Sequence, residues 1–290
     1  MMDVVRQPRN VYVNSGTRML YSSSRTTPVS WRVSAGDQRS RRRDMDVYSQ
    51  RRKHLYHPDL ERAKCMADVY HILARKTLMG AKKNTSDTMR YMVGVAGAPG
   101  SGKSTLAKQV VHIINAIQEE ECAVMVPMDG YHYTKAQLDG FDNPAEAHAR
   151  RGAHWTFDAE GFVRKVEELA YTTGESIDAP TFDHGQGDPV ARGICIERHH
   201  GIVIVEGNYL LLDIEPWNRL IFNETWFIDC DIEESMKRVY TRQTRNGVPP
   251  RESRHRIETN DRPNALQIQQ TAERAHVCVP SLHFRRPYWK

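Results

Sequence analysis

The chain has 290 residues, a length that favours one domain of about 200–250 residues with an extension. Its five cysteines form no Cys-x-x-Cys pair, which argues against a zinc site or a disulfide framework, and no apolar run approaches the ~18 residues of a membrane span. The net charge of +5 is uneven: residues 1–58 hold 12 basic and 4 acidic side chains, and the remainder holds 29 and 32. The main part of the chain is therefore mildly acidic and offers no basic face for nucleic acid.

The N-terminal segment differs in composition from the rest. Residues 1–43 contain nine Arg, seven Ser and two acidic residues, with too few apolar side chains to fold alone. This composition is typical of organelle transit peptides, and equally of a solvated tail without a targeting role. We therefore expect residues 1–58 to form a disordered or targeting extension and residues 59–290 to form the folded domain. The protein is cytoplasmic under one interpretation, and mitochondrial or plastid under the other.

After Pro58 the pattern becomes helical. Met66, Val69, Tyr70 and Leu73 share one helix face, which predicts a helix packed against the domain before its first strand. The polar residues 82–88 then predict a loop.

The next segment, residues 97–104, reads GAPGSGKS and matches the phosphate-binding loop pattern G-x-x-x-x-G-K-[ST]. An apolar run at residues 91–96 predicts a strand before it, and residues 104–117 have the apolar spacing of a helix after it. Backbone N–H groups of such a loop, together with the helix N-terminus, bind phosphate. A chance glycine-rich turn would not need this strand and helix.

In such a loop the lysine reaches the β- and γ-phosphates of ATP and the serine ligates Mg²⁺, roles that fall here on Lys103 and Ser104. The residues expected to bind the nucleotide are Gly97, Ala98, Pro99, Gly100, Ser101, Gly102, Lys103, Ser104 and Thr105.

Strand and helix patterns alternate through the rest of the domain. Further strands are predicted at residues 123–128, 202–205, 225–228 and 275–279, and further helices at residues 158–170 and 232–246. Such βα units imply a parallel sheet with helices on both faces. Ligands bind at the carboxyl ends of the strands of such sheets.

Two carboxylates follow strands at that edge. Asp129 comes after the second strand and is a candidate for the base that takes the proton of an attacking hydroxyl. Glu206 follows four β-branched residues and is a candidate to hold the metal ion. Taken singly, each carboxylate could instead cap a helix or a turn, but their joint position beside the phosphate loop favours the functional interpretation.

Arginines recur after residue 232. Arg238, Arg242 and Arg245 have helical spacing, residues 247–250 break the helix, and a second helix follows. A broken helix carrying arginines is typical of a lid that closes over ATP phosphates. Arg242 is the lid residue we single out, and solvated surface arginines are the alternative.

Several motifs together resemble one family. The segments GAPGSGKST, PMDGYHY, RRGAHWTFD, PTFDHGQGDPV, VIVEGNYLLLD and NDRPN occur in the order and spacing of the uridine kinase-like P-loop kinases, a superfamily that includes phosphoribulokinase and bacterial pantothenate kinase. The resemblance covers roughly residues 66–279. It implies an α/β P-loop NTPase fold, with a parallel sheet of about five strands flanked by helices and an arginine-bearing helical lid.

The resemblance also implies transfer of the ATP γ-phosphoryl group to an alcohol hydroxyl of a small molecule, with ATP and Mg²⁺ as cofactors. Asp129, Lys103 and Arg242 would then be catalytic, and Ser104 and Glu206 would hold the metal. The residues that would line the acceptor site are Tyr131, His132, Arg150, Asp183 and His184. A nucleoside is the first acceptor to consider, and sugars or pantothenate-type alcohols are alternatives.

Two other classes of nucleotide-binding protein were compared with this pattern. A regulatory GTPase is disfavoured because the chain has no Asn-Lys-x-Asp or Thr-Lys-x-Asp motif. A P-loop ATPase or nucleotide-binding adaptor would keep Lys103 and Ser104 without needing a base or an acceptor pocket, and it stays open. We expect no nucleic-acid or membrane partner, and the sequence is compatible with a homo-oligomer.

Overall fold

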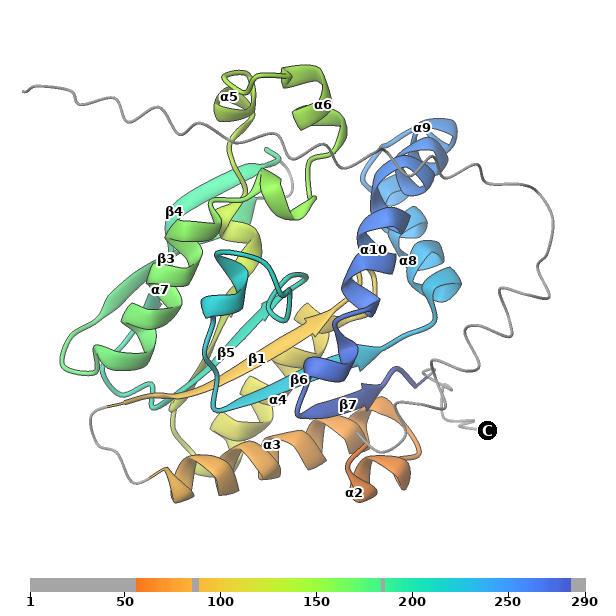
Figure 1. Ribbon diagram of the computed structural model, residues 1–290. Coiled ribbons are helices and arrows are strands. Elements are labelled where there is room, and N and C mark those ends of the chain that lie inside the picture. Colours follow the sequence, from red (N-terminus) through yellow and green to blue (C-terminus); the bar gives the residue numbers. More distant parts are fainter. Residues whose placement is uncertain (1–55, 85–88, 184–185, 283–290) are drawn as a thin grey trace, which may run out of the picture. The chain divides into compact units, whose positions relative to one another are not determined.

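The computed structural model describes residues 56–84, 89–183 and 186–282 (Figure 1). Most of the expected N-terminal extension lies outside these residues, so its role stays a prediction. Among the helices of the described residues, none has the length and apolar character needed to span a membrane.

A parallel sheet of five strands forms the centre of the domain, as predicted. The strand order is β2-β5-β1-β6-β7, and each neighbouring pair is parallel. The strands are β1 (Tyr91–Gly97), β2 (Ala123–Pro127), β5 (Ile202–Gly207), β6 (Glu224–Asp229) and β7 (Val277–Pro280). Every residue of β1 and β5 is buried. Strands covered on both faces need apolar side chains at every position, which is why the sequence shows these strands as continuous apolar runs.

Helices cover both faces of this sheet (Figure 1). Val93 and Val95 of β1 pack in the cluster with α3 (Met66–Lys83) and α4 (Lys103–Gln118). The alternate residues Met92 and Ala96 pack in the cluster with α7 (Ala159–Tyr171) and α10 (Arg262–Gln269). This division follows from the alternation of side chains along a strand.

Local sequence signals fix the ends of the longer helices. Asp158 caps α7 by accepting from the Gly161 N–H at 2.9 Å, and Asp231 caps α8 (Ile232–Arg245) by accepting from the Glu234 N–H at 2.9 Å. A break after α8 leads to α9 (Pro250–Arg256), which begins with proline. A π-helical turn, η5 (Ile257–Asp261), joins α9 to α10.

Some elements differ from the expected ones. The helix α3 continues through Lys83 rather than ending before Lys82, and basic side chains suit its last turn. An antiparallel hairpin of β3 (Ile177–Asp183) and β4 (Asp188–Ile196) forms a separate sheet that the sequence did not indicate. The remaining short elements are α2 (Pro58–Glu61), η2 (Met128–Tyr131), α5 (Lys135–Leu138), α6 (Pro144–Ala149), η3 (His154–Thr156), η4 (Trp217–Arg219) and η6 (Ala272–Arg274).

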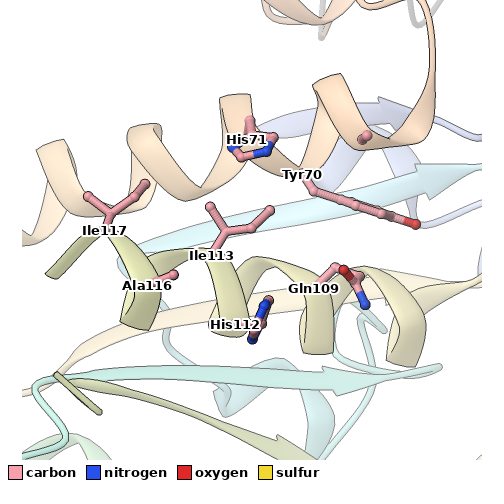
Figure 2. A pocket seen from close by; sticks show the side chains of 8 residues that line it. Tyr70, His71, Gln109, His112, Ile113, Ala116 and Ile117 are labelled. Atoms are coloured by element: carbon pink, nitrogen blue, oxygen red, sulfur yellow. The ribbon is translucent and has the colours of Figure 1, made fainter. Parts of the chain in front are cut away.

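A groove of about 410 Å³ lies between α3 and α4 (Figure 2). Tyr70 and His71 of α3 line it together with His112, Ile113 and Ile117 of α4. Among the predicted site residues that the structure describes, none lines this groove.

Tyr56, near the C-terminal end of the expected extension of residues 1–58, contacts the folded domain. The Tyr56 hydroxyl donates to Asp229 Oδ2 at 2.7 Å, and its backbone forms a parallel bridge with Cys278 of β7. His57 then caps α2, with its Nδ1 accepting from the Asp59 N–H at 3.3 Å.

Two truncations test where the folded domain begins. Removing residues 1–50 should leave the melting temperature within about 2 °C of the full chain, because this segment cannot bury enough surface to offset its ordering entropy. Removing residues 1–58 should lower it by several degrees, because the Tyr56 hydrogen bond and its packing are lost. Calorimetry measures both, and an equal loss in the two truncations would contradict this boundary.

Candidate active site

The phosphate-loop segment joins β1 to α4, as its motif predicts. Gly100 has a φ of +80°, and a Cβ there would lie 2.4 Å from the Ser235 carbonyl oxygen. Gly102 caps α4 with a φ of +103°, and a Cβ there would meet nothing within 4 Å. The loop therefore packs closely against α8 on one side and borders open space at the N-terminus of α4, where an anion is stabilised.

The Lys103 side chain is buried, with 7% of its surface exposed. Its Nζ donates to the Ala98 carbonyl oxygen at 3.1 Å. Burial lowers the pKa of Lys103, the charges of Glu206 and Asp129 oppose that shift, and Arg242 adds to it. The structure therefore brings together four residues that the sequence selected from four separate segments.

Glu206 lies at the end of β5 with 5% of its surface exposed. Its Oε1 accepts a hydrogen bond from the Ser104 hydroxyl at 2.9 Å. Burial raises the pKa of Glu206, and the neighbouring Lys103 ammonium opposes that effect. A hydroxyl and a carboxylate beside a phosphate loop are hard oxygen donors that suit Mg²⁺, so these residues fit the expected metal.

Asp129 lies in η2, directly after β2. Its carbonyl oxygen accepts from the His132 N–H at 3.2 Å, and His132 Nδ1 lies 2.8 Å from the same oxygen. Because a carbonyl can only accept, Nδ1 carries the proton in this contact. The Asp129 carboxylate is close enough to raise the pKa of both Lys103 and Glu206. The backbone at Asp129 is thus held in place while its charge acts on the phosphate loop.

The predicted acceptor residues Tyr131 and His132 lie in different surroundings. The Tyr131 ring packs edge-on against Phe162 in the core, and within the described structure its buried hydroxyl has no hydrogen-bond partner. Burial raises the pKa of Tyr131. The His132 ring lies between Phe157 and Phe182, with ring centroids 4.0 and 4.8 Å away. The aromatic rings of both residues therefore serve packing, and the Tyr131 hydroxyl keeps its hydrogen-bonding capacity.

Arg150 and Asp183 come from two further segments. Arg150 follows α6, and its Nε donates to Asn260 Oδ1 at 3.1 Å. Asp183 ends β3, and its Oδ1 accepts from the Gln186 N–H at 3.2 Å. His184 lies outside the described residues, so its place in the site stays a prediction.

Sequence reasoning missed two side chains here. Tyr209, which follows β5, is buried and donates its hydroxyl proton to the Gly152 carbonyl oxygen at 2.7 Å. Burial raises the pKa of Tyr209, and the charges that also act on it include those of Arg150 and Asp129. Arg151 pairs with Asp188 at 2.7 Å and so ties the segment after α6 to the hairpin. Both residues lie in the motifs VEGNYLLL and RRGAHWTFD, which were the available signals.

Arg242 is exposed on α8. It lies within electrostatic reach of Lys103 and of Asp261, whose pKa it lowers against the larger effect of burial. The helix break after α8 is present, and the lid role of Arg242 stays a prediction.

Three side chains of metal-binding type also gather near the opposite ends of the strands. Ligand atoms of Glu121, His199 and His200 lie within 4.8 Å of one another. However, His200 Nδ1 accepts from the Glu197 N–H at 2.8 Å, which places the proton of the neutral ring on Nε2. Ligating histidines normally donate, rather than accept, through their second nitrogen, so we assign no metal to this cluster.

Glu206 makes the metal site sensitive to acid. Because its pKa lies above the ordinary value of 4.5, it gains a proton, and loses its charge for Mg²⁺, at a higher pH than a solvated Glu. The Mg²⁺-dependent part of nucleotide affinity should therefore begin to fall at a higher pH than a solvated Glu would cause. Glu206→Gln keeps an acceptor for Ser104 and should remove this dependence along with most of the Mg²⁺ effect. Titration calorimetry across pH measures it, and an unchanged pH profile in the variant would contradict the assignment.

Comparison with known proteins gives one consistent result. Residues 92–281 match the model of the Phosphoribulokinase / Uridine kinase family. A Schizosaccharomyces pombe protein whose name proposes a uridine kinase is 48% identical over 129 residues, which cover 44% of this chain and 55% of that protein. The ATP-dependent kinase YFH7 of Lachancea thermotolerans is 30% identical over 223 residues, covering 64% of this chain and 63% of that protein. The matched region thus spans little more than half of these relatives.

The fold agrees with solved structures. A Silicibacter sp. TM1040 protein proposed to be a fructose transport system kinase aligns with a TM-score of 0.64 and 29% identity, over 72% of this chain and 98% of that chain. YFH7 from Saccharomyces cerevisiae, described as a P-loop containing kinase, aligns with a TM-score of 0.66 at 23% identity, over 74% of this chain and 99% of that chain. The domain therefore has the fold of the P-loop kinases, and the chain belongs to the phosphoribulokinase/uridine kinase family.

Proposed function

We propose that the protein transfers the γ-phosphoryl group of ATP to a hydroxyl of a small molecule, with a nucleoside as the first acceptor to test. The observation that carries the proposal is the meeting of Lys103, Glu206 and Asp129 at adjacent strand ends, close enough for both carboxylates to act on the lysine pKa. An ATPase or an adaptor would need the phosphate loop but not the second carboxylate.

The loop residues supply binding and charge. Gly102 caps α4 without a side-chain hydrogen bond, so the backbone N–H groups at the N-terminus of this helix would be available to the phosphates. Lys103 would offer its remaining N–H donors to the transferring phosphoryl group, and charge placed there stabilises the transition state. Ser104 and Glu206 would hold Mg²⁺, which when bound neutralises charge on the phosphate oxygens.

Asp129 would act as the general base. Its backbone is held by two contacts from His132, and its side chain starts from the end of β2, next to β5 in the sheet. From there it would orient the acceptor hydroxyl toward the phosphoryl group and take its proton as the new bond forms.

Two acceptor classes have a specific observation in their favour. The name of the Schizosaccharomyces pombe relative favours a nucleoside, and the description of the Silicibacter protein as a fructose transport system kinase favours a sugar. A panel of nucleosides, sugars and pantothenate-type alcohols, each added with a non-hydrolysable ATP analogue, separates them. A true acceptor stabilises the fold by ~2.7 kcal/mol at a hundredfold excess over its dissociation constant.

Lys103→Ala tests the phosphate loop. The substitution removes the charge that follows the transferring phosphoryl group, so ATP turnover should fall by orders of magnitude. Steady-state assays measure it, with Lys82→Ala, an exposed lysine in the last turn of α3, as the matched control. Turnover within about threefold of the unmodified protein would sink the assignment of the loop.

Asp129→Asn separates a kinase from an ATPase. The shape is kept but the hydroxyl proton has no acceptor, so phosphorylation of the acceptor found in the panel should fall by ~10²–10⁴. Nucleotide affinity should change only a few-fold, and ATP hydrolysis should fall less than transfer. Asp142→Asn, an exposed carboxylate between α5 and α6, is the control. Unimpaired transfer would reject the base, and intact hydrolysis without any acceptor would favour the ATPase or adaptor.

A further inference from the structure

Two adjacent side chains of the π-helical turn η5 face different parts of the site. Asn260 bonds to the segment that follows α6, which carries the expected acceptor residue Arg150. Asp261 bonds to α8, which carries the expected lid residue Arg242. The motif NDRPN therefore begins at the junction of two regions that a kinase must bring together.

The Asn260 side chain is almost fully buried, with 1% of its surface exposed, and makes three hydrogen bonds. Its Oδ1 accepts from Arg150 Nε at 3.1 Å and from Asn264 Nδ2 at 3.2 Å, and its Nδ2 donates to the Arg151 carbonyl oxygen at 2.9 Å. Arg150 donates a second time, from one terminal nitrogen to Asn264 Oδ1 at 3.3 Å. Two amides thus fix the plane of one guanidinium group without neutralising its charge.

Asp261 makes the corresponding contact on the lid side. Its Oδ2 accepts from Gln243 Nε2 at 2.9 Å, and Gln243 Oε1 accepts from the buried Ser253 hydroxyl of α9 at 2.8 Å. Burial raises the pKa of Asp261, and Arg256, the Gln243 hydrogen bond and Arg242 each lower it. The end of α8, the start of α9 and the π-turn are therefore joined through one glutamine.

Asn260 and Asp261 are consecutive residues of the π-helical turn η5. A π-helix has i→i+5 hydrogen bonds and is rare, usually appearing as a single turn inside an α-helix. Consecutive side chains on any helix point in different directions, so Asn260 can reach Arg150 while Asp261 reaches Gln243. Any movement of α8 and α9 that carries this turn also displaces Asn260, one hydrogen-bond partner of Arg150, whereas the other partner, Asn264, lies in the adjoining helix α10.

We propose that Asn260 and Asp261 are positioning residues that couple the lid helices to the acceptor side, with Asn260 orienting Arg150 when nucleotide draws the lid inward. The coupling rests on the phosphotransfer function proposed above. Asn260 and Asn264 already hold Arg150 in this structure, so a lid movement that follows nucleotide binding would reach Arg150 through those hydrogen bonds and change how it meets the acceptor.

The coupling is measured by amide hydrogen exchange in the full chain, with Mg²⁺ and the non-hydrolysable analogue AMP-PNP as the probe. In the unmodified protein AMP-PNP should slow exchange in residues 97–105, at the phosphate loop, and by about fivefold or more in residues 150–157, the low end of common coupling strengths. Asn260→Ala should abolish the second effect and keep the first, with AMP-PNP affinity within about threefold. Thr259→Ala, an exposed neighbour in the same turn, is the control and should match the unmodified protein.

Arg150→Lys tests the same contact from its other partner, in case Asn260→Ala does not fold. Lysine lacks the planar guanidinium that donates to Asn260 from Nε and to Asn264 from a terminal nitrogen. The partly exposed position should tolerate the change, so protection of residues 150–157 should again be lost. The proposal is overturned if either variant keeps the protection, or if the unmodified protein shows none. ATP turnover that survives Lys103→Ala would instead count against the proposed function, and the two failures are thereby distinguished.

Discussion

Burial of the Lys103 ammonium group is the constraint on which the site depends. Removing a charged group from water is costly unless it is paired or hydrogen-bonded, and here one carbonyl and two carboxylates offset that cost. The carboxylates come from β5 and β2, which lie on the same side of β1 in the strand order. Pro127 of β2 pairs with Glu206, and Val95 of β1 pairs with the same residue, so the register of three strands sets the spacing of the charges. A slip of one residue would turn Glu206 to the other face.

Arg90 is a second buried cation, and its hydrogen bonds provide a comparison for those of Lys103. Arg90, with 1% of its surface exposed, donates to the carbonyl oxygens of His200, Leu169, Thr172 and Glu197. The guanidinium group thus donates to backbone carbonyl oxygens of the protein, so Arg90 has a structural role. Lys103 is nearly as buried but donates within the described structure to Ala98 alone, out of three available N–H groups. The difference between the two cations supports a phosphate as a further partner of Lys103.

The sequence predicted the parts of the fold that bury apolar runs and missed the parts that do not. All five strands of the main sheet were located because their residues are apolar at successive positions. Strand β4 was missed because most of its side chains are exposed and it contains no such run. The location of Asp129 and Glu206 at strand ends likewise followed from the apolar runs that precede them, while their role in a site stays a prediction. Asn260 lies 110 residues from Arg150 along the chain, and nothing in local periodicity indicates that contact or the π-turn that makes it. Tyr131 was named from its motif, yet its ring belongs to the core.

Arg150 and Arg151, which follow α6, have partners of different charge. Arg151 is paired with the Asp188 carboxylate and stacks over Phe182 at 5.6 Å, so its charge serves to join two loops. Arg150 is held by neutral amides and keeps its full charge. That charge and the charge of Asp129 act on the pKa of Tyr209 in opposite directions, so Tyr209 lies within electrostatic reach of both residues. If Arg150 meets the acceptor, as proposed, Asn260 and Asn264 would set the orientation of the cation that an oxygen-rich or anionic group of the acceptor contacts, while Asp129 takes the proton of its hydroxyl.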